Sequence, residues 1–164
     1  MVLVDMNQVT LSSLMMQIGR DSEVNADLVR HMVLNSIRMY RTKFVEDYGE
    51  LVLCYDSKHY WRKDFFPQYK SNRKKMREAS DFDWKTIFDT LNILKEELKE
   101  NFPYKILEVY GAEADDIIAT ICESEEEDIM IISGDKDFIQ LQKYKNVKQW
   151  NPVQKKLLNG KNPE

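Results

Sequence analysis

Short apolar runs, each the length of one buried strand, recur along the chain between charged or turn-forming residues. Five segments are predicted as strands on this basis: residues 1–5, 51–55, 105–110, 129–132 and 146–150. Several of these runs are continuously apolar, which is typical of strands covered on both faces of a parallel sheet. The pattern therefore predicts a buried, mostly parallel sheet.

Apolar residues at helical spacing occupy the intervals between these strands. They predict a helix that begins at Asn7 or Thr10 and ends at Gly19, a helix over residues 25–48 ended by Gly49, a helix over residues 83–101 capped by Asp83, a helix after Gly111, and a short helix beyond Phe138. Because helices alternate with strands along the chain, we expect an α/β fold.

Carboxylates follow three of the predicted strands. Asp5 ends the first strand, Asp56 follows the second, and Asp135 comes just after residues 129–132. Parallel strands bring their carboxyl ends to one edge of a sheet, where open α/β sheets bind their ligands. An alternative interpretation stays open, because Gly-Asp is also a turn dipeptide and Asp137 is able to cap a helix that begins at Phe138.

The helix after Gly111 begins with three acids, Glu113, Asp115 and Asp116. Acids in a first helical turn interact favourably with the helix dipole, but three of them exceed that need. Carboxylates crowded at one edge raise each other's pKa, so such a cluster is costly without a cation. Oxygen ligands suit a hard divalent ion, and the sequence therefore predicts a magnesium site.

Charge is unevenly distributed along the chain. The net charge is −4, but residues 58–77 hold eight basic residues against one acid, a charge of +7, so the remainder carries −11. Five aromatic residues interleave with these bases: Tyr60, Trp61, Phe65, Phe66 and Tyr69. Cations and rings directly after Asp56 suit phosphates and unpaired bases. The alternative is a solvated charged helix pinned to the core by a few aromatics.

Length and composition limit the classes of protein to which the chain can belong. The 164 residues are one ordinary domain's worth. No apolar run approaches the roughly 20 residues of a membrane span, and no signal peptide is evident, so no membrane contact and a cytoplasmic location are expected. Cys54 and Cys122 are interpreted as buried thiols without a chemical role. No Ser-His-Asp or Cys-His pair is present for covalent catalysis.

Taken together, the motifs resemble the amino-terminal nuclease half of the flap-endonuclease or 5′-nuclease family, and most of all its ribonuclease H branch from T-even-type phages. The motifs that carry this resemblance are LVDMNQV, LCYDSKHYWRKDF, YKSNRKK, YGAEADD, IISGDKDF, YKNVKQW and NPVQKK. The resemblance implies a PIN-like, resolvase-like fold, with a mostly parallel central sheet, helices on both faces and a basic helical arch. It also implies magnesium-dependent hydrolysis of phosphodiester bonds.

The resemblance assigns roles to individual residues. By that likeness the first magnesium site consists of Asp5, Asp56, Glu113, Asp115 and Asp135, with Asp116 acidic in some relatives as well, and Asp135 and Asp137 face a second site. Arg62 and Lys70 would approach the scissile phosphate, and Asp115 and Asp135 would share the catalytic role. The implied nucleic-acid contacts are Lys58, Tyr60, Arg62, Lys63, Lys70, Arg73, Lys74 and Lys75.

The resemblance also implies a division of the chain and a set of partners. Residues 1–150 would form the nuclease domain, with the arch at 57–80, and residues 151–164 a basic tail leading to a helix-three-turn-helix region that the chain does not contain. The second metal site is then expected to be incomplete and duplex binding weak. Expected substrates are DNA and RNA–DNA hybrids with a 5′ end or flap, as in primer removal during replication, with Mn²⁺ able to replace Mg²⁺. A second polypeptide, a single-stranded-DNA-binding protein or a sliding clamp are the expected protein partners.

Three rival hypotheses remain. An aspartyl-phosphate phosphatase would need an acid two residues after Asp5, where Asn7 stands. A toxin-like ribonuclease on a small α/β domain would not need the basic, aromatic arch. A non-catalytic nucleic-acid-binding half of a split nuclease is the alternative from another class of protein.

Overall fold

Within the described part of the chain, six strands form one sheet in the order β3-β2-β1-β4-β5-β6. The computed structural model describes residues 1–17, 25–68, 70–78 and 83–160. The strands are β1 Val2–Asp5, β2 Leu51–Tyr55, β3 Lys105–Glu108, β4 Ile129–Ile132, β5 Val147–Asn151 and β6 Lys156–Leu158. All neighbours are parallel except β6, which runs antiparallel to β5. The predicted α/β fold with a mostly parallel sheet is confirmed.

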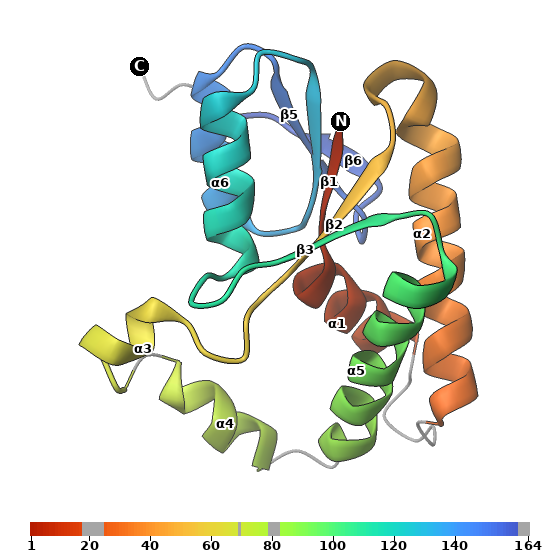
Figure 1. Cartoon of the computed structure of the whole chain (residues 1–164), viewed down its shortest axis with the longest axis vertical. Helices are drawn as coiled ribbons and strands as arrows, with labels where there is room; N and C mark the ends of the chain where they lie inside the picture. The colour runs from red at the N-terminus through yellow and green to blue at the C-terminus, as the bar shows by residue number, and fades with distance from the viewer. Residues whose placement is uncertain (18–24, 69, 79–82, 161–164) are drawn as a thin grey trace.

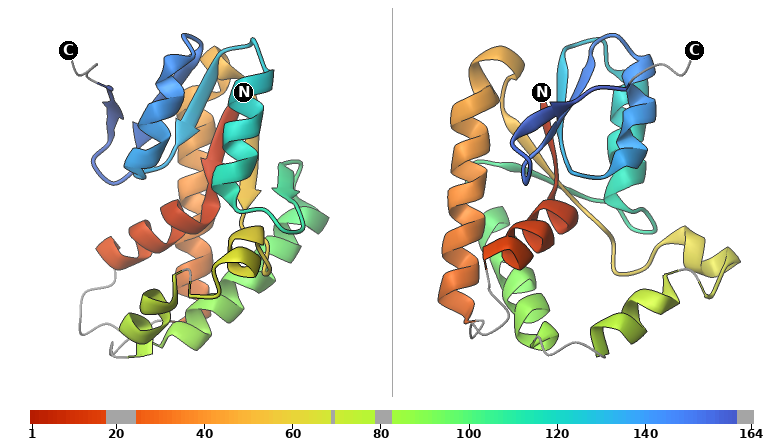
Figure 2. Two further views of the ribbon diagram at one scale, coloured as in Figure 1. Left: turned by 90° about the vertical axis from the view of Figure 1, so that its left-hand side faces the viewer. Right: turned by 180° about the vertical axis from the view of Figure 1, so that it is seen from behind.

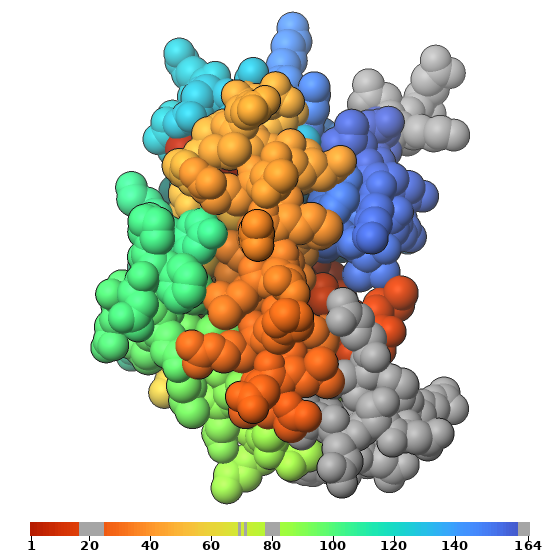
Figure 3. Space-filling model, turned by 90° about the vertical axis from the view of Figure 1, so that its right-hand side faces the viewer, coloured from red at the N-terminus to blue at the C-terminus, as the bar shows by residue number. Residues whose placement is uncertain are grey.

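Helices cover both faces of the sheet (Figures 1 and 2). One face is covered by α1 Met6–Gln17, α2 Ala26–Tyr48 and α5 Trp84–Asn101, and the other by α6 Ala114–Ser124 and the 3₁₀ helix η1 Lys136–Lys143. Figure 3 shows α2 running along one side of the molecule with α5 beside it. None of the helices in the described part of the chain has the length and apolar character that crossing a membrane requires.

Alternate side chains of the central strands pack into two separate hydrophobic cores. Val2 and Val4 of β1 pack into the core under α1, α2 and α5, whereas Leu3 packs into the core under α6 and η1. Successive residues of a strand point to opposite faces, so a strand between two helical layers must be apolar at every position. This requirement explains the continuous apolar runs in the sequence.

The basic segment leaves the sheet at the edge where β1 leads into α1. It contains two short helices, α3 Trp61–Phe65 and α4 Ser71–Glu78, which form an arm away from the sheet (Figure 1). A single parallel bridge between Tyr60 and Gly111 ties the start of the arm to the loop before α6. Gly111 has a φ of 82°, in the left-handed region that favours glycine.

Several boundaries differ from those predicted. Helix α1 begins at Met6 with no connecting loop, and Asp135 rather than Asp137 is the N-cap of η1, its side chain accepting from the Asp137 backbone N–H. Residues 156–158, expected in a tail, form β6, because Gln149–Asn151 offers an edge for them to pair with. The predicted helix end at Gly19, the ring of Tyr69 and residues 161–164 lie outside the described residues.

Candidate active site

Five predicted site acids line one cleft at the carboxyl edge of the sheet. Asp5 is the last residue of β1, Asp56 follows β2, and Asp135 lies three residues after the end of β4. Since these three strands are parallel neighbours, their carboxyl ends meet at that edge. Asp115, from the first turn of α6, and Asp137 line the same cleft, which encloses about 860 Å³.

The hydroxyl of Ser133 joins the ends of β1 and β4. Ser133 Oγ donates to Asp5 Oδ2 at 3.0 Å and accepts from the Asp135 backbone N–H at 3.1 Å. Asp5 is 4% exposed and Ser133 is fully buried. One buried hydroxyl therefore sets the relative position of two of the acids.

Two glutamines hold the turn that follows β4. Gln8 Oε1 accepts from the Gly134 backbone N–H at 2.9 Å, and Gln149 Nε2 donates to the Ser133 and Asp135 carbonyl oxygens at 2.9 and 2.7 Å. A side chain at Gly134 would place its Cβ 3.0 Å from Gln8 Nε2. Neither glutamine was predicted as a site residue from the sequence. The available signal was Gln149 at an inward-facing strand position, two residues after the apolar Val147.

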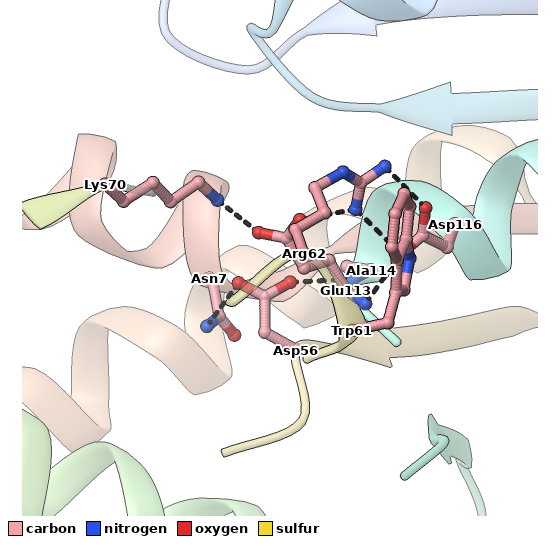
Figure 4. Close-up of polar contacts among 8 residues, drawn as sticks. All are labelled: Asn7, Asp56, Trp61, Arg62, Lys70, Glu113, Ala114 and Asp116. Carbon is pink, nitrogen blue, oxygen red and sulfur yellow. Dashed lines mark hydrogen bonds and ion pairs between the residues drawn. The ribbon is translucent and has the colours of Figure 1, made fainter. Parts of the chain in front are cut away.

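Asp56 is oriented by the start of α6 and by α1. Its Oδ1 accepts from the Ala114 backbone N–H at 2.7 Å, and its Oδ2 accepts from Asn7 Nδ2 at 3.3 Å (Figure 4). The first N–H groups of a helix lack partners within the helix and favour a negative charge. The strand-end acid and the amino terminus of α6 therefore hold each other in place.

Glu113 is held by two cations of the arm. It is 1% exposed, its Oε2 accepts from Arg62 Nη1 at 2.6 Å, and Lys70 Nζ pairs with its Oε1 (Figure 4). Lys70 has a φ of 58°, a backbone region that costs a non-glycine residue roughly 1–2 kcal/mol.

Asp116 contacts the arm and its own helix instead of the cleft. Its Oδ1 and Oδ2 accept from Arg62 at 2.8 and 2.9 Å, and Oδ2 also accepts from Trp61 Nε1 at 3.3 Å and from the Glu113 backbone N–H at 3.0 Å. It is not among the described residues that line the cleft. Both of its oxygens are used in joining α3 to α6, so we leave it out of the proposed metal ligands.

Burial and mutual repulsion raise the pKa values of the acids in the cleft. Burial raises the pKa of Asp5 to about 7, and the charge of Asp115 adds to this, while the hydrogen bond from Ser133 opposes it. Burial, with the charges of Asp56 and Glu113, raises the pKa of Asp115 to about 6. Burial also raises the pKa of Asp56 against the effect of the Ala114 N–H. A positive charge in this cleft would lower the pKa values of all three acids.

The predicted metal cluster is not formed as a ready coordination sphere. As the side chains stand, no three His, Cys, Asp or Glu residues in the described part of the chain are arranged to hold a metal ion. Four of the predicted ligands are instead engaged by donors of the protein itself. These pairs are Asp5 with Ser133, Asp56 with Ala114 and Asn7, Glu113 with Arg62 and Lys70, and Asp135 with the Asp137 N–H.

Cations of the arm form the wall of the cleft opposite the acids. Of the predicted nucleic-acid contacts, those that line it are Lys58, Tyr60, Lys63, Lys70, Arg73 and Lys74. Arg77, which was not predicted, lines it too. Arg62 and Lys75 are not among the described lining residues. Lys63 Nζ and Lys70 Nζ lie 4.6 and 5.6 Å from the centroid of the Tyr60 ring, within cation–π range.

The two cysteines are free and buried, as predicted. Burial, then the charge of Asp5, raises the pKa of the Cys54 thiol to about 12, and burial raises that of Cys122 to about 11. Neither lines the cleft. Thiols with raised pKa values are poor nucleophiles and poor metal ligands.

A doubly covered, mostly parallel sheet with acids at its carboxyl edge and a cationic arm defines a resolvase-like domain. Residues 2–162 match the family described as "5'-3' exonuclease, N-terminal resolvase-like domain". The chain therefore belongs to this family.

Among curated proteins, the chain is 41% identical over 160 residues to the ribonuclease H of Enterobacteria phage T4, a match that covers 94% of this chain and 52% of that protein. It is 35% identical over 103 residues to the flap endonuclease Xni of Shewanella sp. (strain MR-4), covering 60% of this chain and 35% of the relative. The chain thus spans about half the length of the phage T4 relative.

Among solved structures, a bacteriophage T5 flap endonuclease in complex with DNA and metal ions matches with a TM-score of 0.71 at 18% identity, covering 96% of this chain and 57% of that one. A bacteriophage T5 protein co-crystallised with metal ions matches with a TM-score of 0.70 at 16% identity, covering 96% and 56%. These likenesses show the fold.

Proposed function

We propose that this domain carries the hydrolytic centre of a metal-dependent 5′ nuclease. The observation that supports this most directly is the cleft, in which strand-end acids face the cations of the arm. A phosphodiester needs both features, because cations bind its phosphates and acids hold the metal ions that activate its hydrolysis. The names of the relatives support the same activity.

The acids of the cleft suit a hard divalent cation. The donors are all carboxylate oxygens, and the pKa values of Asp5 and Asp115 are raised by burial and by neighbouring negative charge, which a cation would reverse. The residues that would hold it are Asp5, Asp56, Asp115 and Asp135, with Glu113 joining once Lys70 leaves it. When bound, Mg²⁺ supplies Lewis-acid chemistry, which acidifies a water molecule and stabilises charge on the departing oxygen. Asp135 and Asp137 would face a second ion, and Mn²⁺ would substitute for Mg²⁺.

We assign different roles to Lys70 and Arg62, the two basic residues that contact Glu113. Lys70 lines the cleft and its ammonium group already lies at the acids, so we assign it the stabilisation of charge on the phosphate in the transition state. Arg62 contacts Glu113 and Asp116 with three hydrogen bonds. We assign Arg62 the positioning of α3 against α6, in place of the direct phosphate contact predicted from the sequence.

The substrates we propose are nucleic acids with a free 5′ end: 5′-tailed DNA and RNA–DNA hybrids such as RNA primers. The phage T4 and Shewanella relatives, named as a ribonuclease H and a flap endonuclease, support these two classes. A polypeptide that supplies the duplex-binding half, a single-stranded-DNA-binding protein and a sliding clamp remain proposed partners.

The decisive experiment compares Asp115→Asn with the parent chain on a 5′-tailed duplex and on RNA-primed DNA in Mg²⁺. We expect cleavage to fall by about 100-fold or more, since removal of a metal ligand costs several kcal/mol of transition-state stabilisation. Glu123→Gln, an exposed acid at the far end of the same helix, is the matched control and should cleave as the parent does. Equal rates for Asp115→Asn and the parent would contradict the proposal.

A second candidate is a non-catalytic nucleic-acid-binding half that depends on a partner for turnover. One observation favours it, because Glu113 is neutralised by Arg62 and Lys70 and the acids in the described part of the chain do not converge on a metal position. Calorimetric titration with Mg²⁺ separates the two candidates. Two binding events favour a complete pair of sites, one favours a partial site, and none favours the binding module.

A further inference from the structure

The cleft extends well beyond the acids, to a partly apolar wall formed by α5. Its lining on that side includes Phe88, Leu91, Asn92 and Lys95. These positions are spaced i, i+3, i+4 and i+7, so they share one face of the helix. Leu11 of α1 lines the cleft as well. One helix face therefore presents an apolar surface and an amide group to a cleft whose other end is ionic.

The ring of Phe88 is only partly used in packing. It is half-buried and stacks on Trp84 with 5.8 Å between the ring centroids and 27° between the planes. Among the described residues that form the two cores or pack against them, Phe88 is absent. Asn92 is exposed beside it, one helical turn further along. An aromatic face with an amide nearby suits a flat ligand with polar edges.

The wall opposite is cationic. Arg73, Lys74 and Arg77 of α4 line the same cleft, and the Arg77 guanidinium lies 5.1 Å from the centroid of the Phe88 ring. Figure 1 shows α4 and α5 on two sides of this region, with α1 at the base of the sheet between them. A ligand here would have an anionic backbone along α4 and an apolar, planar part on α5.

We propose that Phe88, Leu91 and Asn92 form a subsite for an unpaired nucleobase of a single strand whose phosphates lie along α4. Bases within a duplex are stacked on each other and cannot present a face to a side chain, whereas an unpaired base can stack on a ring and hydrogen-bond through its edge. The proposal rests on the proposed function, in that it assigns bases as well as phosphates to the same cleft.

The test measures binding instead of cleavage, in EDTA, so that no turnover occurs. The probes are a fluorescently labelled oligothymidylate and an abasic strand of the same length and charge, followed by fluorescence anisotropy. We expect the parent chain to bind the base-bearing strand more tightly. Phe88→Leu should weaken that binding by about fivefold or more and leave the abasic strand unchanged, because the variant removes the stacking ring and keeps the cations that bind phosphate.

Matched variants separate the subsite from general effects. Ile93→Ala, on the same helix but 61% exposed and outside the cleft lining, should bind both strands as the parent does. Lys74→Gln should weaken both strands alike, because it removes a cation that binds phosphate. Asn92→Ala changes an exposed residue, so folding is preserved, and it should weaken only the base-bearing strand, by about threefold.

The proposal is overturned if Phe88→Leu and Asn92→Ala change both strands equally, or change neither. Its failure is distinct from that of the proposed function. Asp115→Asn is expected to lower cleavage by about 100-fold or more and to keep the preference for the base-bearing strand in EDTA. If the chain prefers the base-bearing strand but Asp115→Asn leaves cleavage unchanged, the nuclease mechanism is contradicted. The base subsite is still supported in that case.

Discussion

At the level of single residues, the site acids are held by the protein before any cation arrives. Asp5 is almost fully buried and accepts a hydrogen bond from the Ser133 hydroxyl, and Asp56 accepts one from the Ala114 backbone N–H. Buried carboxylates that also repel each other keep their protons to a higher pH than usual. Charge repulsion among these acids therefore destabilises the folded state at the proposed active site.

Replacing Asp5 tests this cost. The folded-state pKa of Asp5, about 7, lies above its unfolded value of 3.8, so the folded chain binds the extra proton between these values. Stability from this group is therefore present at low pH and is lost as the pH rises towards 7. We expect Asp5→Asn, which keeps an acceptor for Ser133, to raise the free energy of unfolding at pH 8 in EDTA by on the order of 2 kcal/mol and to change it little near pH 4.

Urea unfolding of both chains from pH 4 to pH 8 measures the difference. Glu126→Gln, at an exposed position in the turn before β4, is the control and should show no such trend. Added Mg²⁺ should stabilise the parent more than Asp5→Asn, since the proposed ligand is the charged form of the acid. A difference between parent and Asp5→Asn that shrinks as the pH rises would contradict this account.

At the level of helices and strands, the site depends on contacts between strand ends. The turn after β4 is fixed to β1 through Ser133, to α1 through Gln8 and to β5 through Gln149. A turn without such partners would leave buried N–H and carbonyl groups unpaired. Contacts with β1 and α1, at the start of the chain, and with β5, near its end, thus set where Asp135 lies.

Ser133→Ala tests this arrangement. The change removes the donor to Asp5 and the acceptor of the Asp135 N–H, and an unsatisfied buried group costs about 1–3 kcal/mol. We expect a decrease of that size in the free energy of unfolding, measured in urea at pH 5. If the alanine chain were as stable as the parent, the hydroxyl bridge would be unimportant.

The start of α6 shows how far an element can be predicted. Three acids fall within one predicted helical turn, and the helix forms there with Glu113 as its N-cap. Neighbouring residues of a helix point about 100° apart, so Asp115 lines the cleft while Asp116 contacts Arg62. Which acid faces the cleft depends on how α6 packs, and residue type alone does not reveal it.

Across the molecule as a whole, charge is separated between the arm and the rest of the chain. Residues 58–77 carry +7 within a chain of net charge −4. The cations of the arm line the same cleft as the acids, so both charges would act on one strand in the proposed complex. This local positive charge is what would allow the proposed binding of phosphates by a chain that is acidic as a whole.

The salt dependence of binding measures this charge separation. Replacing Arg73 and Lys74, which line the cleft, by Gln should reduce the slope of log affinity against log salt by about 1.4 for a single strand, or about 0.7 for each phosphate that is no longer neutralised. The control is the replacement by Gln of Lys145, just before β5, and Lys148, within β5, both of which are exposed and outside the cleft lining. Equal slopes for the two double variants would place the strand elsewhere.

Local sequence pattern was enough to specify most of the elements and the edge at which they meet. Continuous apolar runs specified β1, β2 and β4, Asn25 and Asp83 marked the starts of α2 and α5, and the acids after the strands indicated one ligand-binding edge. These features follow from burial and capping, which act over a few residues.

The division of the acids between cleft, arm and cap emerged only from the packed fold. Packing brought Arg62 and Lys70 onto Glu113, drew Asp116 away from the cleft, used Asp135 as the cap of η1 and added β6 to the sheet. Nearly all of these outcomes depend on pairs of residues far apart in the chain. Their charges and hydrogen bonds compete for the same partners, and that competition is settled only when the elements pack together.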